Sequence, residues 1–210
     1  MKKHLILTLC LIILQNSYSQ QNENISKRKD SKSIFQININ SQQYTLVEGD
    51  ELMLDDKIDK TKISVKLLDF KKFDNGSISF DYPSNFSFES EESEGYKDWN
   101  FDGNNYVISI FEIEGGTTVK DFIDNMIEQF GEENCETENI QIELGNKKLN
   151  GIKLKVSLAG EKIIIDWLKI ETIGENSKYI SFQGSIDDNG IGTKESRDTF
   201  KMINDSINFK

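Results

Sequence analysis

Histidine, cysteine, arginine and proline are all scarce in this sequence, and each scarcity narrows the possible functions. The 210 residues include one proline, one histidine (His4), two cysteines (Cys10 and Cys135) and two arginines (Arg28 and Arg197). Thirty-six acidic residues stand against 25 basic ones, which gives a formal net charge of −11. A nucleic-acid-binding protein is therefore excluded, because phosphate contacts need lysine and arginine gathered on one face.

The first 19 residues predict a cleavable secretory signal peptide. Lys2 and Lys3 provide a basic start, residues 5–14 are almost entirely apolar, and residues 17–19 offer small side chains for cleavage. The apolar run is shorter than the roughly 20 residues that a membrane-spanning helix needs. Acylation of Cys10 is the alternative, but the residue before this cysteine is not small. We therefore expect export to the periplasm, the envelope or the exterior.

Removal of residues 1–19 would also limit the chemistry of the mature chain. The net charge becomes −13 because two lysines are lost, and His4 and Cys10 are removed as well. Histidine-assisted nucleophilic catalysis and zinc sites built from histidine and cysteine are then excluded. Cys135 is left alone, so no intramolecular disulfide can form, and its glutamate neighbours disfavour the thiolate. We expect no cofactor and no metal.

Three regions follow the predicted signal peptide. Residues 20–33 are polar and predict a flexible linker. Residues 34–69 predict a small β-rich appendage, because apolar and polar side chains alternate at Ile63, Val65 and Leu67. The rest of the chain, residues 70–210, predicts one larger domain.

The larger domain combines strands with two helices. Residues 106–113 are apolar on both faces, so we expect a central strand. A helix begins at Thr118, followed by Asp121 in a variant of the capping box, and carries an apolar stripe as far as Phe130. Three or four strands form a meander, and a final helix begins near Thr193 or Ser196.

The turn at residues 159–160 sets the register of two meander strands. A two-residue turn places Val156 opposite Ile163, Leu154 opposite Ile165, and Ile152 opposite Trp167. The same register places Lys153 opposite Asp166. One face of this strand pair is therefore entirely apolar.

These elements predict an α+β fold, an antiparallel sheet flanked by two helices with a small N-terminal β-rich appendage. Over about residues 70–210, a strand ends at Tyr82-Pro83, a long loop leads to Trp99, and the central strand, the helix, the meander and the closing helix follow. This order of elements resembles the PsbP-like α/β/α sandwich superfamily. The resemblance implies a binding or assembly scaffold and carries over no common active site.

Asp166 is the carboxylate that lies within an apolar strand, between Ile165 and Trp167. A general acid with a raised pKa would have this setting. A cross-strand ion pair with Lys153 explains the same residue without any function, and we favour that interpretation.

The segment from Ser185 to Gly190 resembles the first half of a calcium loop. Asp187 and Asn189 have the expected spacing and the glycine falls at the sixth position, but Ser196 stands where the bidentate glutamate belongs. We favour an ordinary turn at this position.

An acidic loop from Glu89 to Asp98 is the best candidate for a partner surface. Clustered negative charge beside aromatic rings suits a basic protein, with the charges steering the encounter and the rings anchoring it. The alternative is a solvated loop with Trp99 in the core. The candidate residues are Glu91, Glu92, Glu94, Tyr96 and Trp99.

We therefore expect an exported, non-enzymatic binding or assembly protein of the cell envelope that binds a protein partner. Two alternatives stay open. One is an immunity-type inhibitor of a basic toxin, and the other is a hydrolase that uses carboxylates alone, such as a glycosidase centred on Asp166. The sequence does not determine the partner or the oligomeric state.

Overall fold

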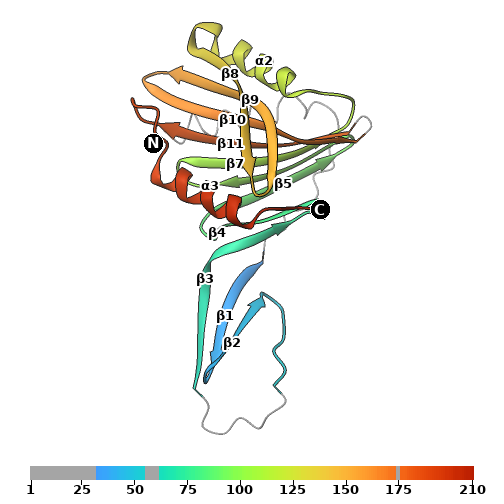
Figure 1. The fold of residues 1–210 in the computed structure, drawn as a ribbon, viewed down its shortest axis with the longest axis vertical. Coiled ribbons are helices and arrows are strands. Elements are labelled where there is room, and N and C mark those ends of the chain that lie inside the picture. The colour runs from blue at the N-terminus through green and yellow to red at the C-terminus, as the bar shows by residue number, and fades with distance from the viewer. Residues whose placement is uncertain (1–31, 55–61, 174–175) are drawn as a thin grey trace.

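The chain is mostly β, with strands in two antiparallel sheets (Figure 1). A computed structural model describes residues 32–54, 62–173 and 176–210, which include two α-helices. The predicted signal peptide at 1–19, with Cys10, and all but the end of the predicted linker at 20–33 lie outside these residues. None of the helices that the structure describes is both long and apolar enough to span a membrane.

The larger sheet has seven strands in the order β5-β6-β7-β11-β10-β9-β8. The chain leaves β7 in the middle of this sheet, crosses one face through α2 (Val119–Phe130), and returns at the edge strand β8. The strands are β5 (Ser87–Ser93), β6 (Tyr96–Asp102), β7 (Tyr106–Ile113), β8 (Cys135–Leu144), β9 (Lys147–Leu158), β10 (Glu161–Ile173) and β11 (Asn176–Ile186).

The predicted register of β9 and β10 is confirmed. Val156 pairs with Ile163, and Lys153 pairs with Asp166. Ala159 and Gly160 both have positive φ, at 53° and 82°. A two-residue turn of this kind matches the twist of the two strands and holds them in a single register.

Helix α2 covers one part of the seven-stranded sheet. Thr118 caps the helix as predicted, because its side chain accepts a hydrogen bond from the Asp121 N–H while the Asp121 carboxylate accepts one from the Thr118 N–H. The buried stripe of α2 packs over β9 and β10, with Phe122 stacked on Trp167 at 4.8 Å between ring centroids. Burial of this stripe is what stabilises the helix.

The smaller sheet has five strands in the order β12-β4-β3-β1-β2. They are β1 (Ser33–Ile39), β2 (Gln42–Val47), β3 (Ile63–Asp74), β4 (Ile78–Pro83) and β12 (Asn208–Phe209). The predicted boundary between residues 69 and 70 falls inside β3, whose first part pairs with β1 and whose last part pairs with β4. We call β1, β2 and residues 63–71 of β3 the arm, which projects from the rest of the molecule in Figure 1.

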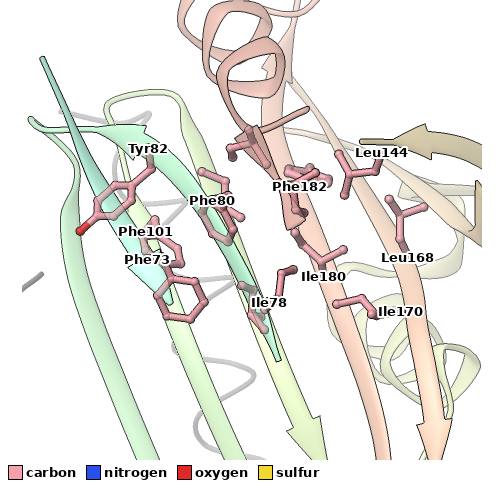
Figure 2. Packing of buried hydrophobic residues seen from close by; sticks show 14 of the residues in the cluster. Phe73, Ile78, Phe80, Tyr82, Phe101, Leu144, Leu168, Ile170, Ile180 and Phe182 are labelled. Carbon is pink, nitrogen blue, oxygen red and sulfur yellow. The ribbon is translucent and has the colours of Figure 1, made fainter. Parts of the chain in front are cut away.

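Helix α3 (Lys194–Ser206), strand β4 and the end of β3 together cover the second face of the larger sheet. Rings from Phe73, Phe80, Tyr82 and Phe101 meet between the two sheets (Figure 2). The predicted α/β/α layering is therefore correct only in part. Seven strands span roughly 29 Å while one helix is about 10 Å wide, so α3 alone cannot cover this face.

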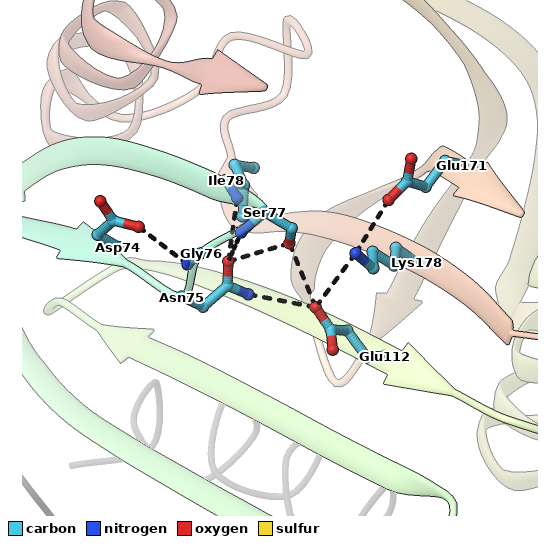
Figure 3. A network of polar contacts seen from close by, with 8 residues as sticks. All are labelled: Asp74, Asn75, Gly76, Ser77, Ile78, Glu112, Glu171 and Lys178. Carbon is cyan, nitrogen blue, oxygen red and sulfur yellow. Dashed lines mark hydrogen bonds and ion pairs between the residues drawn. The ribbon is translucent and has the colours of Figure 1, made fainter. Parts of the chain in front are cut away.

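A polar network ties the β3–β4 turn to the larger sheet (Figure 3). The Asn75 side-chain oxygen accepts hydrogen bonds from the backbone N–H groups of Ser77 and Ile78, at 3.1 and 3.0 Å. The Asn75 amide donates to Glu112 on β7 at 3.4 Å, and Lys178 on β11 lies 3.7 Å from the same carboxylate. The two sheets are thus held by polar contacts at one end and by rings along their length.

Candidate binding site

Asp166 lies on the face of β10 that α3 covers, since it pairs with Phe182 on one side and Lys153 on the other. The predicted ion pair is present, with 3.6 Å between the Lys153 Nζ and the Asp166 Oδ1. This Oδ1 is buried and has no hydrogen-bond partner. Burial raises the pKa of Asp166, and the Lys153 charge only partly offsets that effect.

Asp166 and Lys153 form part of the floor of a cavity of about 270 Å³, which we call the Asp166 pocket. The sheet provides the floor, and the first turns of α3 with the loop before it provide the opposite wall. The lining residues are Tyr106, Ile142, Lys153, Ile164, Asp166, Phe182, Gly184, Ser185, Ile186, Gly190, Gly192, Ser196, Arg197 and Phe200. Two candidates that the sequence analysis weighed separately, Asp166 and the loop that ends at Gly190, therefore border one cavity.

Several of these pocket residues carried no signal in the sequence. Arg197 is exposed at the rim, and its Nη1 donates a hydrogen bond to the Gly192 carbonyl. Tyr106 is buried beside Phe182, and burial, with the Asp166 charge as a smaller cause, raises the pKa of its phenol so that it stays protonated. Phe200 packs edge-on against Phe182 at 5.2 Å. Their grouping depends on how α3 docks onto the sheet.

The loop at 187–190 is a turn that is stabilised by hydrogen bonds from its backbone N–H groups to the Asp187 side chain. The Asp187 Oδ1 accepts hydrogen bonds from the N–H groups of Asn189 and Ile191, at 2.9 and 2.8 Å. These bonds lower the pKa of Asp187, the one from Ile191 most. The turn thus uses the Oδ1 of the carboxylate that a calcium loop would need. No cluster of three or more potential metal ligands occurs in residues 32–54, 62–173 and 176–210.

The acidic segment from Glu89 to Asp98 is not a loop, and this part of the prediction is wrong. It forms most of the hairpin β5–β6, with Glu91 opposite Asp98 and the turn at Glu94 and Gly95. Glutamate has low strand propensity, so the pairing of β5 with β6 explains this strand better than its local sequence does.

The five partner-surface candidates on this hairpin separate by burial. Glu92 and Glu94 are exposed, and Glu92 forms an ion pair with Lys97. Tyr96 is 7% exposed and packs beside Phe111, whereas Trp99 is half-buried against Phe73 on the opposite face. The hairpin therefore offers negative charge, including half-buried Glu91, but Tyr96 cannot act as an exposed anchoring ring.

Cys135 begins β8 and is half-buried. Burial raises the pKa of its thiol, and the nearby Glu133 charge raises it further. This is the direction that the glutamate neighbours predicted, and it leaves Cys135 a poor nucleophile.

The arm carries a row of exposed apolar side chains, which the sequence analysis used only as the alternating pattern of a strand in the β-rich appendage. Ile63, Val65 and Leu67 on β3 are 53%, 61% and 52% exposed. They pair with Ile39, Ile37 and Phe35 on β1, so the two rows share one face of the sheet. Tyr44 and Leu46 on β2 extend this apolar face of the arm.

Comparisons with known proteins yield only distant structural similarities. No family model matches the chain, and no curated protein matches it. A crystal structure from Bacteroides thetaiotaomicron has a TM-score of 0.41 at 16% identity and covers 68% of this chain, which spans 49% of that protein. LpqN of Mycobacterium tuberculosis, described as involved in cell envelope biogenesis, has a TM-score of 0.39 at 12% identity, covering 67% of this chain and 90% of LpqN.

Proposed function

We propose that this chain is an exported, non-enzymatic binding protein of the cell envelope, and that its arm contacts a basic protein partner. The observation that carries this proposal is the exposed row Ile63, Val65 and Leu67 on a projecting sheet. Contiguous apolar surface of this kind on a folded protein marks interaction sites. In the finer classification that we propose, residues 70–210 form a PsbP-like domain, for which the order of elements is the support.

The charge distribution favours a basic partner. The chain carries a formal net charge of −11, whereas in the arm β1 and β2, residues 33–47, contain no charged residue and residues 63–71 of β3 contain two lysines and one aspartate. Exposed acidic side chains such as Glu92 and Glu94 lie on the larger sheet. The charges would speed the encounter with a basic protein, and the apolar face of the arm would supply the contact energy. An immunity-type inhibitor is the special case in which this partner is a toxin.

A carboxylate-only glycosidase has less support. The usual mechanism needs two carboxyl groups on opposite sides of the scissile bond. Among the described residues that line the Asp166 pocket, Asp166 is the one carboxylate. The proposal therefore favours binding over hydrolysis.

Site-specific photo-crosslinking tests the arm directly. A benzophenone amino acid at position 65 lies on the apolar face of the arm, and the same probe at position 66 lies on the other face of the same strand. We expect the probe at 65 to capture one basic envelope protein that the probe at 66 does not capture. Raising the ionic strength from about 0.05 to about 0.5 M should slow the capture.

A matched pair of variants completes this experiment. Val65→Asn should abolish the capture by a probe placed at 67, whereas Ser64→Asn should leave it unchanged, because Ser64 lies on the other face and neither substitution alters the charge. Equal capture at 65 and 66, or a crosslinked dimer of this chain in place of a basic partner, would contradict the proposal.

A further inference from the structure

The Asp166 pocket contains a hydrogen-bond acceptor and a donor that do not satisfy each other. The Asp166 Oδ1 and the Lys153 Nζ are 3.6 Å apart, which is an ion pair but too long for a hydrogen bond. The Oδ1 is buried without a hydrogen-bond partner, and the Asp166 and Lys153 side chains are only 19% and 25% exposed. Leaving a buried charged oxygen without a hydrogen bond costs free energy, so a group that donates to it would bind favourably.

A hydroxyl group is the chemistry that satisfies both side chains at once. It donates its proton to the Asp166 carboxylate and accepts a hydrogen bond from the Lys153 ammonium through its lone pairs. An ammonium group could donate to Asp166 but would be repelled by Lys153. A carboxylate could accept from Lys153 but would be repelled by Asp166.

The rim does not add a free charge that would reverse this preference. Arg197 donates to the Gly192 carbonyl, and its charge interacts with the Asp187 carboxylate in the same loop. The nearby pairs Lys153–Asp166, Lys155–Glu138 and Arg197–Asp187 balance in sign, so an uncharged ligand fits best.

The walls and the size of the pocket suggest the rest of the ligand. Ile142, Ile164 and Phe200 provide apolar and aromatic surface around the polar floor. The volume of about 270 Å³ falls just below the range of about 300–1,000 Å³ for drug-sized ligand sites. A single ring with hydroxyl groups on its edge and C–H groups on its faces matches both features.

We propose that the Asp166 pocket binds a small, uncharged, polyhydroxylated ring of monosaccharide size, with one hydroxyl bridging Asp166 and Lys153. This site is independent of the arm, and it would operate whether or not the arm binds a protein. The ligand class follows from the paired acceptor and donor on the floor and the apolar walls around them.

Titration of the folded chain with ring compounds, followed by NMR of the backbone amides, tests the proposal. The probes are D-glucose, D-galactose, N-acetyl-D-glucosamine and myo-inositol, with cyclohexylamine and cyclohexanecarboxylate as charged comparisons. We expect at least one of the four uncharged probes to shift the amides of Asp166, Gly192 and Arg197 with a millimolar dissociation constant. The two charged rings should bind at least about tenfold more weakly.

Two substitutions that preserve side-chain volume separate binding from folding. Asp166→Asn and Lys153→Met should each weaken the binding of that probe by about tenfold or more, with amide spectra that show an intact fold. The matched control is Lys97→Met, because Lys97 forms a direct cross-strand pair with Glu92 on the β5–β6 hairpin and does not line this pocket. This control should bind as the unaltered chain does.

Three results would overturn the proposal. The first is that none of the four uncharged probes shifts the pocket amides at about 50 mM. The second is binding that Asp166→Asn and Lys153→Met leave unchanged. The third is tighter binding of the amine or the carboxylate than of any uncharged ring.

Discussion

Asp98 is the most strongly perturbed carboxyl group outside the candidate pocket. It is 2% exposed on β6, and burial raises its pKa from 3.8 to about 7. The negative charge of Glu91 adds to this effect, while the hydrogen bond that Asp98 accepts from the Asn100 amide opposes it. Because the buried carboxyl is more easily protonated than in the unfolded chain, its ionisation destabilises the fold.

Asp98→Asn should therefore change the dependence of stability on pH. Between pH 4 and pH 7 the folded protein binds more protons than the unfolded chain at this site, so the free energy of unfolding falls as the pH rises. The asparagine variant lacks this loss. We expect it to be more stable by about 2–4 kcal/mol at pH 8, and by much less at pH 4, in urea unfolding.

Glu94→Gln is the control for this measurement, since Glu94 is exposed at the β5–β6 turn. Its stability should follow the unaltered chain at both pH values. An equal effect of Asp98→Asn at pH 4 and pH 8 would show that ionisation of Asp98 is not the cause.

Gly151 is a position where the absence of a side chain is required by packing. A Cβ added to Gly151 would lie 1.8 Å from the Trp167 carbonyl oxygen on β10. Gly151→Ala should therefore separate β9 from β10 and lower the free energy of unfolding by about 3–5 kcal/mol, measured by urea unfolding. A cost below about 1 kcal/mol would mean that the two strands can move apart easily.

Gly160 is the matched glycine for comparison. It has a positive φ of 82° and no atom within 4 Å of an added Cβ. Gly160→Ala should cost only about 1 kcal/mol, from backbone strain alone.

At the scale of elements, the sequence correctly predicted the helix and the strand pairing that are determined by interactions between residues close together in the chain. Helix α2 has its own cap at Thr118 and its own apolar stripe, and the β9–β10 pairing follows from the short turn at Gly160. The same register correctly placed Lys153 opposite Asp166, and these two residues form part of the pocket floor. These features depend on residues that are close together in the chain.

The sequence analysis did not predict features that depend on contacts between residues far apart in the chain. The strand β12 exists because Asn208 and Phe209 pair with β4, and the wall of the Asp166 pocket exists because α3 packs over the sheet. Arg197 and Phe200 therefore had no pattern that connected them with Asp166. The sequence also did not predict that β3 continues from the arm into the larger domain. An alternating strand has the same pattern whether it pairs with one neighbouring strand or with different strands along its length.

Asn75 is the residue through which the β3–β4 turn holds its shape. Its side-chain oxygen accepts from the N–H groups of Ser77 and Ile78, and its amide donates to Glu112 (Figure 3). Asn75→Ala should leave these groups without their Asn75 partner. We expect the free energy of unfolding to fall by about 1–3 kcal/mol, measured by calorimetry. Ser77→Ala keeps the backbone bonds to Asn75 and should cost less. The reverse order of the two variants would contradict this role of Asn75.

For the whole molecule, the two sheets should differ in protection from hydrogen exchange. The central strands β7 and β11 are paired on both sides and almost fully buried, whereas β2 is an edge strand with exposed and half-buried side chains. We expect amides of β7 and β11 to exchange at least about a hundredfold more slowly than those of β1 and β2, measured by NMR. Equal protection would mean that the arm and the larger sheet open together.

The continuity of β3 has a mechanical consequence. A pull on the tip of the arm along β3 would reach the ladder in which Phe70–Asp74 pair with Ser79–Pro83. The load would act parallel to the strands, so the hydrogen bonds of this ladder would resist together in shear instead of opening one after another. An arm attached in this way could hold the chain to an anchored partner under tension without unravelling the five-stranded sheet from its edge.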